Sequence, residues 1–315
     1  MTEAPIDVGV IGVGHLGRHH ARIYTELAST RLVGVVDRDR ARAAEIAERC
    51  GCAVFESVAD IAPRIRAASV AVPTAHHAEV SVELLRAGVD VLVEKPLARS
   101  TAEAEAINRA ADEHDRIVMT GHTERFNPAV IALQRAVDAP RFFEIHRLAA
   151  FSRRSTDIDV VLDLMIHDLD LVLYLDGSRA ISVDAIGVSA LTDKVDIANA
   201  RVRFESGCVA NLTASRISAE AVRRIRVFQS RTYLSCDTGA RKVERYRLTL
   251  TPAGPQIFHD MLPVEEGEPL RTELSVFAEA VRTRRRPAID GRQGQRVLDL
   301  AHQVRAAIDA ERARL

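Results

Sequence analysis

One segment of the sequence, residues 160–175, carries side chains suited to acid–base chemistry on an otherwise apolar helical pattern. Asp163, His167 and Asp170 stand at positions i, i+4 and i+7, so an α-helix would place them on one face, with Asp168 to one side. Ionisable groups in apolar surroundings are costly unless they are paired or serve a site. The stripe therefore needs an explanation.

Two interpretations fit this stripe. The first is an Asp–His pair that is buried for structural reasons, as ion networks often are. The second is a catalytic base: a neutral His167 can accept a hydroxyl proton near neutral pH, and Asp163 would orient the imidazole. The cofactor-binding pattern described next favours the second, so we expect His167 to be the base in the oxidation of an alcohol.

A glycine-rich loop, Gly12-Val-Gly14-His-Leu-Gly17, follows a strand-like run and precedes a helical pattern. In that context Gly12 permits a tight turn, Gly14 lets the backbone approach a pyrophosphate, and Gly17 allows close packing of the helix. The pyrophosphate would lie at the helix N-terminus, beside His15 and Leu16. The motif predicts a dinucleotide site.

The end of the next strand carries the residue expected to choose the cofactor. Asp37 lies twenty positions after Gly17, where a carboxylate can accept hydrogen bonds from the adenosine ribose and would repel a 2′-phosphate. This favours NAD. Arg38 and Arg40 follow at once, and a guanidinium there could instead accept a 2′-phosphate, so NADP is the alternative.

Two further strand ends point toward the cofactor. Pro73 and Thr74 follow one predicted strand, and Glu94-Lys95-Pro96 follows the next. Ligands of open α/β sheets bind outside the carboxyl ends of the strands, and proline stiffens such a turn. We expect Lys95 to donate a hydrogen bond to the reacting oxygen, to stabilise the alkoxide-like transition state and to help relay its proton.

The other histidines have less evidence for a chemical role. His122 and Arg125, in the sequence GHTERFNP, are expected to bind the substrate. His122 could line the substrate cleft, or it could serve in capping or packing. His19, His20 and His76 are dispersed over predicted helices and loops without the spacing of metal ligands, so structural roles are expected and no metal is predicted.

The elements that would position these residues fall into two patterns. Over residues 1–122, apolar β-branched runs alternate with helical patterns, which predicts a doubly wound parallel sheet, a Rossmann domain. The predicted strands are Ile6–Ile11, Leu32–Val36, Ala68–Val72, Val89–Val93 and Ile117–Met119. The predicted helices are Leu16–Leu27, Arg40–Arg49, Ala78–Ala87 and Thr101–His114, the last opened by a capping box at Ser100.

Residues 123–315 follow a different pattern, rich in alternating strand-like runs, and predict an α+β domain whose sheet is largely antiparallel. The predicted strands are Phe142–Phe151, Ile181–Leu191, Ile197–Phe204, Cys208–Ser215, Ile225–Ser230 and Arg245–Thr251, with a hairpin turn at Glu205-Ser206-Gly207. The predicted helices are Pro128–Val137, 160–175, Arg271–Arg284 and Gln293–Arg312.

Composition sets the class of protein. A chain of 315 residues exceeds the size at which one core keeps growing, so two domains are expected. A net charge of -1 excludes an overall field for nucleic acid or membranes. The four cysteines lack the spacing of zinc sites or disulfide frameworks, and no apolar run reaches the roughly 18 residues of a membrane span. We expect a cytoplasmic protein.

The motifs GVGHLG, PTAHH, EKPLA, GHTERFNP and DLMIHDLD, in this order and spacing, resemble the glucose–fructose oxidoreductase/inositol dehydrogenase (Gfo/Idh/MocA) family along nearly the whole chain. The resemblance implies that Lys95 and His167 are catalytic and that Asp163 assists. It also implies that the second domain binds a sugar substrate. The large open sheet of that domain would form the interface of a homo-oligomer, a dimer or a tetramer. The residues it places near the cofactor are Pro73, Thr74, His77, Glu94 and Lys95.

The segment before the D-x-x-x-H motif departs from the family, which usually has a glycine-rich segment where this chain has STDIDVV. This segment is similar to the branch of the family that oxidises the 3-hydroxyl of UDP-N-acetylglucosamine on the way to lipid A precursors. Arg153 and Arg154, just upstream, could clamp a UDP pyrophosphate, or could be exposed loop arginines.

Other functions remain open on the same pattern. A dehydrogenase of inositol, of a free sugar or of another nucleotide sugar would use the same residues. A non-catalytic NAD(P)-binding sensor would need the glycine loop but no acid–base stripe, so the presence of Lys95, Asp163 and His167 disfavours it.

Overall fold

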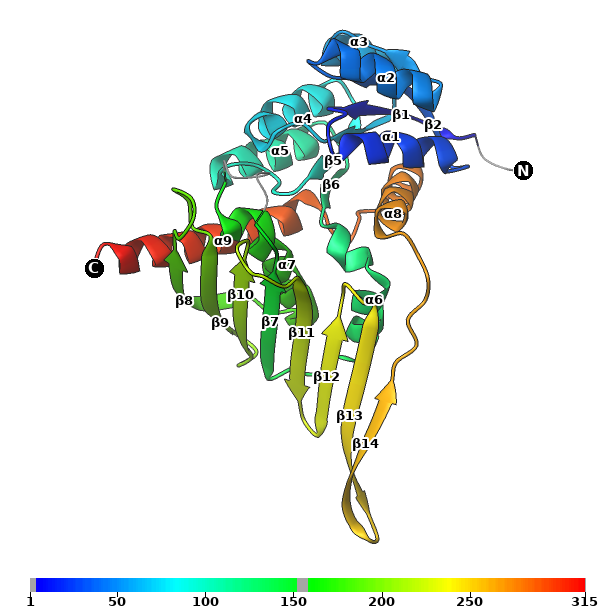
Figure 1. Ribbon diagram of the computed structural model, residues 1–315. Coiled ribbons are helices and arrows are strands. Elements are labelled where there is room, and N and C mark those ends of the chain that lie inside the picture. The colour runs from blue at the N-terminus through cyan, green and yellow to red at the C-terminus, as the bar shows by residue number, and fades with distance from the viewer. Residues whose placement is uncertain (1–3, 152–157, 315) are drawn as a thin grey trace. The chain divides into compact units, whose positions relative to one another are not determined.

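The computed structural model describes residues 4–151 and 158–314 (Figure 1). The chain divides into two units that are discontinuous in sequence. Unit 1 comprises Met1–Thr123 and Leu270–Leu298, and unit 2 comprises Glu124–Pro269 and Asp299–Leu315. Residues 270–298 thus return to the N-terminal unit. The division of labour predicted for residues 1–122 and 123–315 remains a prediction.

Unit 1 is built on a parallel sheet of six strands in the order β3-β2-β1-β4-β5-β6. The strands are β1 Ile6–Ile11, β2 Thr30–Val36, β3 Ala53–Val54, β4 Ala67–Val70, β5 Asp90–Glu94 and β6 Val118–Gly121. The order reverses between β1 and β4, and such a switch point is where doubly wound sheets bind their ligands. The predicted Rossmann sheet is confirmed.

Helices flank this sheet on both faces, with α4 and α5 side by side (Figure 1). The helices are α1 Gly17–Glu26, α2 Arg40–Cys50, α3 Val58–Ile61, α4 His77–Arg86 and α5 Thr101–Glu113. Local sequence fixes their ends: Ser100 caps α5 by accepting a hydrogen bond from Glu103 N (3.2 Å), and Gly51 ends α2 with a φ of 64°. The Ser100 half of the predicted capping box is therefore present, whereas the Glu103 carboxylate accepts from Arg99 N (3.0 Å).

The returning segment of unit 1 contains α8 Pro269–Thr283, from Leu270 onward, and the start of α9 Gly291–Arg312. It extends the β6 edge, since Thr120 N donates to Ile289 O (2.9 Å). Arg284 Nη1 donates to both carboxylate oxygens of Asp90, a fully buried residue (2.9 and 2.7 Å). A buried carboxylate on β5 is thus neutralised by the C-terminal part of the chain.

Unit 2 is built on an eight-stranded sheet in the order β14-β13-β12-β11-β7-β10-β9-β8. Neighbouring strands are antiparallel except β7 and β10, which are parallel. The strands are β7 Phe142–Leu148, β8 Ala180–Val188, β9 Ile197–Phe204, β10 Val209–Ser215, β11 Val222–Gln229, β12 Thr232–Asp237, β13 Lys242–Thr251 and β14 Gly254–Met261. The predicted mainly antiparallel sheet is confirmed.

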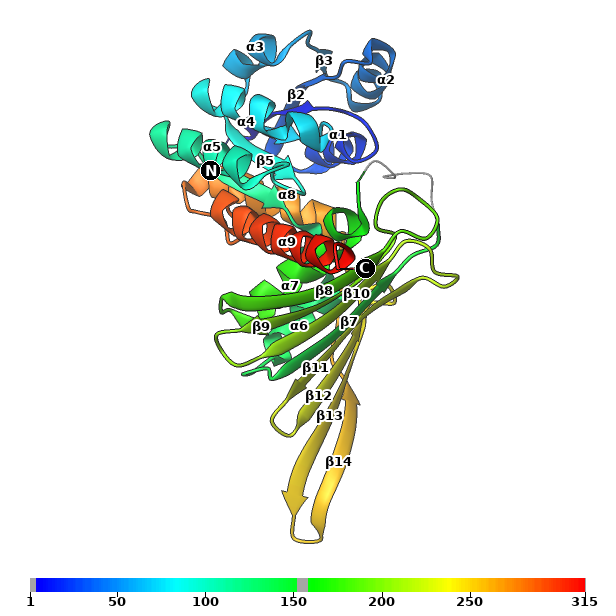
Figure 2. The same cartoon turned by 90° about the vertical axis from the view of Figure 1, so that its left-hand side faces the viewer.

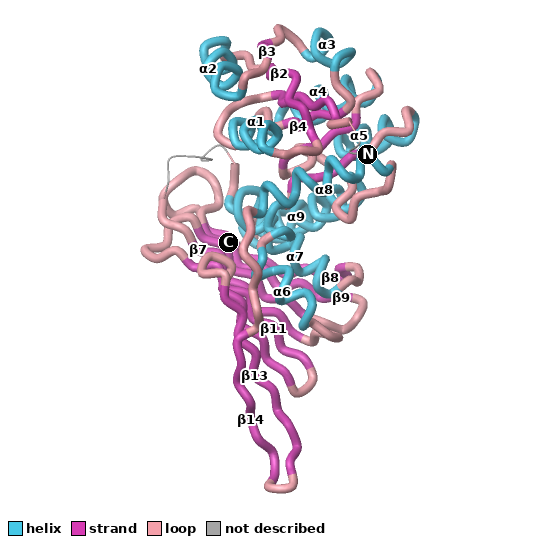
Figure 3. The backbone as a smooth tube through the Cα atoms, turned by 90° about the vertical axis from the view of Figure 1, so that its right-hand side faces the viewer, coloured by secondary structure: helices cyan, strands magenta, loops and turns pink. Residues whose placement is uncertain are grey.

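The two faces of this sheet differ. Helices α6 Pro128–Ala136 and α7 Ile166–Asp176 lie on one face (Figures 2 and 3), and β7 buries Phe143 and Ile145 toward it. The other face carries an aromatic ladder of cross-strand neighbours, with ring centroids 4.5–5.7 Å apart. The ladder consists of Phe142, Phe228, Tyr233, Tyr246 and His259.

Two kinds of expectation need correction. The strands β3, β12 and β14 were absent from the expected set: β3 has only two residues, β12 is short and follows a tight turn, and β14 opens with Gly-Pro and lacks clean alternation. The segment expected as one α-helix over 160–175 instead begins with a π-helical turn, Val161–Met165, in which Ile166 N donates to Val161 O five residues back. Within the described residues, no helix is long and apolar enough to cross a membrane.

Candidate functional site

The glycine loop of unit 1 has the shape that a pyrophosphate requires. A Cβ on Gly17 would lie 1.8 Å from Gly12 O, and Gly12 has a φ of +86° with backbone of Ala71 2.8 Å from its Cβ position, so only glycine fits at either place. A Cβ on Gly14, by contrast, would meet no described atom within 4 Å. The turn is therefore packed against the protein at Gly12 and Gly17, and it is open at Gly14, where the pyrophosphate of a dinucleotide would approach.

The start of α1 also fits a bound anion. Leu16 occupies the N-cap position and has no oxygen with which to cap the helix, and its side chain is 42% exposed. His15, beside it, is exposed as well. An exposed leucine at a helix start that has no side-chain cap is explained when a dinucleotide covers it. These residues fit NAD.

Asp37 is held in place by backbone donors. Its Oδ2 accepts a hydrogen bond from Val13 N (2.8 Å) and its Oδ1 accepts one from Asp39 N (2.9 Å). Arg38 Nη1 lies 3.3 Å from His76 Nε2, and Arg40 pairs with Glu56. The carboxylate is therefore oriented at the end of β2, and both neighbouring arginines already have contacts within unit 1.

The turns after β4 and β5 are tied together by one buried histidine. His77 Nδ1 lies 2.9 Å from Pro96 O and its Nε2 lies 2.9 Å from Val72 O. Burial lowers the pKa of His77 against the effect of these carbonyls. Lys95 is half-buried beside this bridge, and the Lys95–Pro96 peptide is cis. Pro73 and Thr74 follow β4 at the same edge of the sheet.

The expected stripe of unit 2 separates into two kinds of residue. Asp168 and Asp170 are buried, and each is paired with an arginine. Asp163, in the π-helical turn, and His167, on the first turn of α7, are half-buried. The structural interpretation therefore describes Asp168 and Asp170, while Asp163 and His167 are partly accessible and their roles as orienting carboxylate and base remain a prediction.

Asp168 belongs to a buried cluster beneath the sheet face. Arg147 donates to it from Nε (3.0 Å to each oxygen) and from Nη2 (2.8 Å), and Glu124 lies 3.6 Å from the same guanidinium. Burial, together with the nearby Glu124 carboxylate, raises the pKa of Asp168 despite Arg147. The cluster anchors α7 to β7.

Asp170 fixes Arg125, which had been expected to touch the substrate. Arg125 Nε donates to both oxygens of Asp170 (3.0 and 2.8 Å), and its guanidinium carbon lies 4.7 Å from the centroid of the Tyr174 ring. Its described contacts are thus structural, and its role toward substrate remains a prediction. Arg153 and Arg154 lie outside the described residues, and His122 is buried in unit 1.

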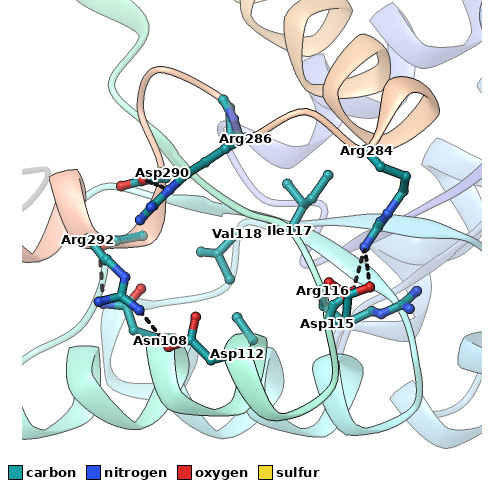
Figure 4. A pocket seen from close by; sticks show the side chains of 13 residues that line it. Asn108, Asp112, Asp115, Arg116, Ile117, Val118, Arg284, Arg286, Asp290 and Arg292 are labelled. Carbon is teal, nitrogen blue, oxygen red and sulfur yellow. Dashed lines mark hydrogen bonds and ion pairs between the residues drawn. The ribbon is translucent and has the colours of Figure 1, made fainter.

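A separate pocket of about 340 Å³ lies at the start of β6, the amino end of the strand (Figure 4). Ile117 and Val118 line it, and several charged side chains surround them. The charged groups pair with one another or with nearby carboxylates: Arg284 with Asp90, Arg292 with Asp112, and Arg286 with Asp290. The predicted cofactor residues gather at the opposite, carboxyl edge of the sheet.

Composition gives a second signal for Lys95. Lys95, Lys194 and Lys242 are the only three lysines among 43 basic residues. Arginine cannot release its proton in a protein, whereas lysine can. A lysine at a strand end in so arginine-rich a chain is consistent with the proton-relay role predicted for Lys95. Within the described residues, no cluster of three or more His, Cys, Asp or Glu side chains could hold a metal ion.

Comparison with known proteins extends over nearly the whole chain. One family model, described as an oxidoreductase family with an NAD-binding Rossmann fold, matches residues 6–122, and a second, described as a GFO/IDH/MocA C-terminal domain, matches residues 127–235. The chain is 41% identical over 305 residues to UDP-N-acetylglucosamine 3-dehydrogenase of Acidithiobacillus ferrooxidans, covering 96% of this chain and 97% of that one.

Solved structures give the same picture. The structure of the Acidithiobacillus ferrooxidans enzyme matches with a TM-score of 0.91 at 40% identity, covering 98% of this chain and 99% of that chain. The scyllo-inositol 2-dehydrogenase of Bacillus subtilis is a more distant relative, 28% identical over 237 residues and 69% of each chain. A levoglucosan dehydrogenase structure shares the fold, with a TM-score of 0.88 at 19% identity over 98% of each chain.

Proposed function

The chain belongs to the GFO/IDH/MocA family of NAD-binding oxidoreductases, and from that premise we propose that it oxidises the 3-hydroxyl of UDP-N-acetylglucosamine. The proposed substrate is supported by the 41% identity, over 96% of the chain, to an enzyme with that activity. The inositol dehydrogenases match a smaller part of the chain or match it at lower identity. A nucleotide sugar is therefore favoured over inositol or a free sugar.

The residues of the two units divide the work of such a reaction. NAD, when bound, supplies the hydride acceptor. Lys95 would donate a hydrogen bond to the oxygen of the reacting hydroxyl and stabilise its developing negative charge. His167 would accept the hydroxyl proton, and Asp163, four residues earlier in the π-helical turn, would orient the imidazole. Arg153 and Arg154 are the proposed ligands of the UDP pyrophosphate.

The setting follows from the same proposal. Oxidation at the 3-position gives a 3-keto nucleotide sugar, the substrate that a transaminase needs, which fits supply of lipid A precursors in the cytoplasm. We also propose a homo-oligomer formed through the open face of the unit 2 sheet, supported by the aromatic ladder and by exposed apolar residues on β13 and β14.

The experiment is a rate assay for NADH formation with a matched panel of substrates. UDP-N-acetylglucosamine is expected to give the highest kcat/KM, ahead of UDP-glucose, free N-acetylglucosamine and myo-inositol, with NAD preferred to NADP. His167→Asn should abolish most turnover while NADH still binds, because asparagine cannot take up the proton. Replacing Arg153 and Arg154 together by Ala should raise KM for the nucleotide sugar more than it lowers kcat.

Each part of the proposal has its own failing result. If activity were highest on inositol or a free sugar, the proposed substrate would be wrong, although the same catalytic residues could act on that other substrate. NADH binding without turnover on any panel member would indicate a sensor. Full activity in His167→Asn would remove the assigned base.

A further inference from the structure

A line of four buried polar side chains runs through unit 1 to the residue that precedes Lys95. Glu94 Oε1 lies 2.9 Å from His20 Nε2, His20 Nδ1 lies 2.9 Å from Ser69 Oγ, and Ser69 Oγ lies 2.8 Å from Tyr24 Oη. Glu94 is 6% exposed and the other three are fully buried. These four side chains are too buried for a role at the surface, and within the described residues they form no metal-ligand cluster. The sequence predicted only a structural role for His20.

The direction of the hydrogen bonds follows from the chemistry of the groups. Burial raises the pKa of Glu94, but the hydrogen bond from His20 and the positive charge of Lys95 outweigh burial and lower it, so the carboxylate is ionised and accepts. His20 Nε2–H therefore donates to Glu94. In a neutral imidazole Nδ1 then accepts from the Ser69 hydroxyl, which in turn accepts from Tyr24, whose pKa is raised by burial so that it keeps its proton.

With His20 in the neutral form, every donor in this line points toward the Glu94 carboxylate. Such chains polarise each link and hold the final acceptor more firmly than a single hydrogen bond would. The other carboxylate oxygen, Oε2, accepts from Lys95 N at 3.3 Å. Glu94 is therefore held through both carboxylate oxygens, by His20 on one side and by the backbone of Lys95 on the other.

The line also joins elements that bear different parts of the site. His20 and Tyr24 lie on α1, the helix that starts at the glycine loop, Ser69 lies on β4, and Glu94 ends β5. Movement of α1 relative to β5 would break the His20–Glu94 contact. The helix that receives the dinucleotide and the turn that presents Lys95 are consequently held in register by one imidazole.

We propose that His20 is a positioning residue for hydride transfer: by donating Nε2–H to Glu94 it holds that carboxylate, and with it the Lys95 turn, in the reactive arrangement. The inference rests on the proposed function for its kinetic test, and the structural test below does not. His20 touches neither substrate nor reacting atoms in this role and acts through Glu94 and Lys95.

Two substitutions separate positioning from packing. His20→Gln places an amide N–H close to where Nε2 stood and can still donate to Glu94, whereas His20→Asn reaches only as far as Nδ1 and leaves Glu94 without that donor. Both remove the imidazole ring. We expect kcat to fall about 10- to 100-fold in His20→Asn, a loss typical when the outer partner of a functional group is removed, with little change in KM. His20→Gln should regain most of the lost kcat.

A spectroscopic readout follows Lys95 without turnover. Because the chain has three lysines, protein labelled with ¹³C at lysine Cε should give three correlation signals, assigned by Lys194→Arg and Lys242→Arg. The Lys95 signal should move in His20→Asn and stay near its wild-type position in His20→Gln. His114→Asn, a change of the same type at an exposed histidine at the end of α5, should leave kcat and all three signals unchanged.

The outcomes are distinct. Equal kcat losses in His20→Asn and His20→Gln, or an unmoved Lys95 signal in both, would overturn the positioning role. An inactive wild type would count against the proposed function, and the Lys95 signal would still decide the inference. Should His20→Asn fail to fold, Ser69→Ala removes the hydroxyl that holds the His20 ring at Nδ1, so His20 should orient Glu94 less firmly, kcat should fall and the Lys95 signal should move. Wild-type kcat and a wild-type Lys95 signal in Ser69→Ala would overturn the positioning role.

Discussion

Three glycines in one loop meet different demands, although the sequence motif treats them as one pattern. Gly12 and Gly17 are needed by the protein itself, because their Cβ positions fall against backbone atoms 2.8 and 1.8 Å away. No atom of the described residues lies within 4 Å of the Gly14 Cβ position, so a side chain there would affect a bound ligand and not the fold. The residue scale thus separates what folding requires from what binding requires.

Gly14→Ala should leave the thermal unfolding of the ligand-free protein unchanged and raise the Kd for NADH on the order of tenfold, which corresponds to about 1.4 kcal/mol. Gly17→Ala should instead lower the melting temperature without ligand, because its methyl group collides with Gly12 O. Scanning calorimetry and NADH fluorescence titration check the pair. A destabilised Gly14→Ala would mean that the open space is filled in solution.

Lys95→Arg keeps the positive charge but removes a proton that can be released. We expect kcat to fall about 10²- to 10⁴-fold, the range of general acid–base contributions, with the Kd for NADH nearly unchanged. Lys194→Arg and Lys242→Arg are matched controls and should retain wild-type kcat. If Lys95→Arg retained the wild-type kcat, Lys95 would contribute only its positive charge and would not relay a proton.

At the scale of elements, the helix that carries His167 shows where sequence periodicity succeeds and fails. The apolar pattern of residues 160–175 correctly gives a packed helix, but i, i+4 counting assumes α-helical geometry, and the π-helical turn at Val161–Met165 departs from it. Nothing in the local pattern distinguishes Asp168 and Asp170 from Asp163, since their arginine partners, Arg147 and Arg125, lie more than twenty and forty positions away.

The strands show the same limit. The buried parallel strand β1 Ile6–Ile11 is apolar apart from Asp7 and matches the expected bounds, and β9 Ile197–Phe204 alternates cleanly and matches as well. β14 gains its place from pairing with β13, and its sequence is mostly exposed, so no burial pattern marks it. Long-range pairing decides what local preference leaves open.

Removing one partner of a buried ion pair in this helix should be costly. Asp170→Ala leaves the Arg125 guanidinium buried without its carboxylate, and we expect a loss of roughly 3–5 kcal/mol in the free energy of unfolding of unit 2. Glu205→Ala, which removes the exposed partner of Arg179, should cost only about 0–1 kcal/mol. Denaturant unfolding compares them, and similar costs would contradict the burial argument.

Acid should destabilise unit 2 through Asp196. Burial raises the pKa of this carboxyl, but hydrogen bonds from Leu191 N and Thr192 and the pairing with Arg216 outweigh burial and hold it well below its usual value. A depressed folded-state pKa gives stability that is present above the unfolded value of about 3.9 and is lost as pH falls through the folded value. Asp196→Asn should therefore flatten the loss of stability below about pH 4, measured by denaturant unfolding at a series of pH values.

At the scale of the whole molecule, one group of exposed large apolar side chains lies on the β13–β14 hairpin, whose ribbon extends beyond the rest of the unit 2 sheet (Figure 1). Leu250 and Ile257 of this hairpin are 61% and 73% exposed, and grouped exposed apolar residues often mark a protein interface. Replacing both by Asp should shift light-scattering mass toward the monomer while NADH binding is retained. An unchanged mass in the variant would mean that the oligomer contact lies elsewhere. A monomeric mass for the wild-type protein would contradict the proposed homo-oligomer.

The return of residues 270–298 to unit 1 has a consequence for how such a gene could change its specificity. Unit 2 is mostly one uninterrupted stretch, Glu124–Pro269, set inside the coding sequence of unit 1. A recombination event with two crossovers could replace that stretch and carry in a new substrate sheet with the cofactor-binding part inherited intact. The constraint on any such exchange is α9, whose latter half, from Asp299, belongs to unit 2 but would be inherited from the recipient.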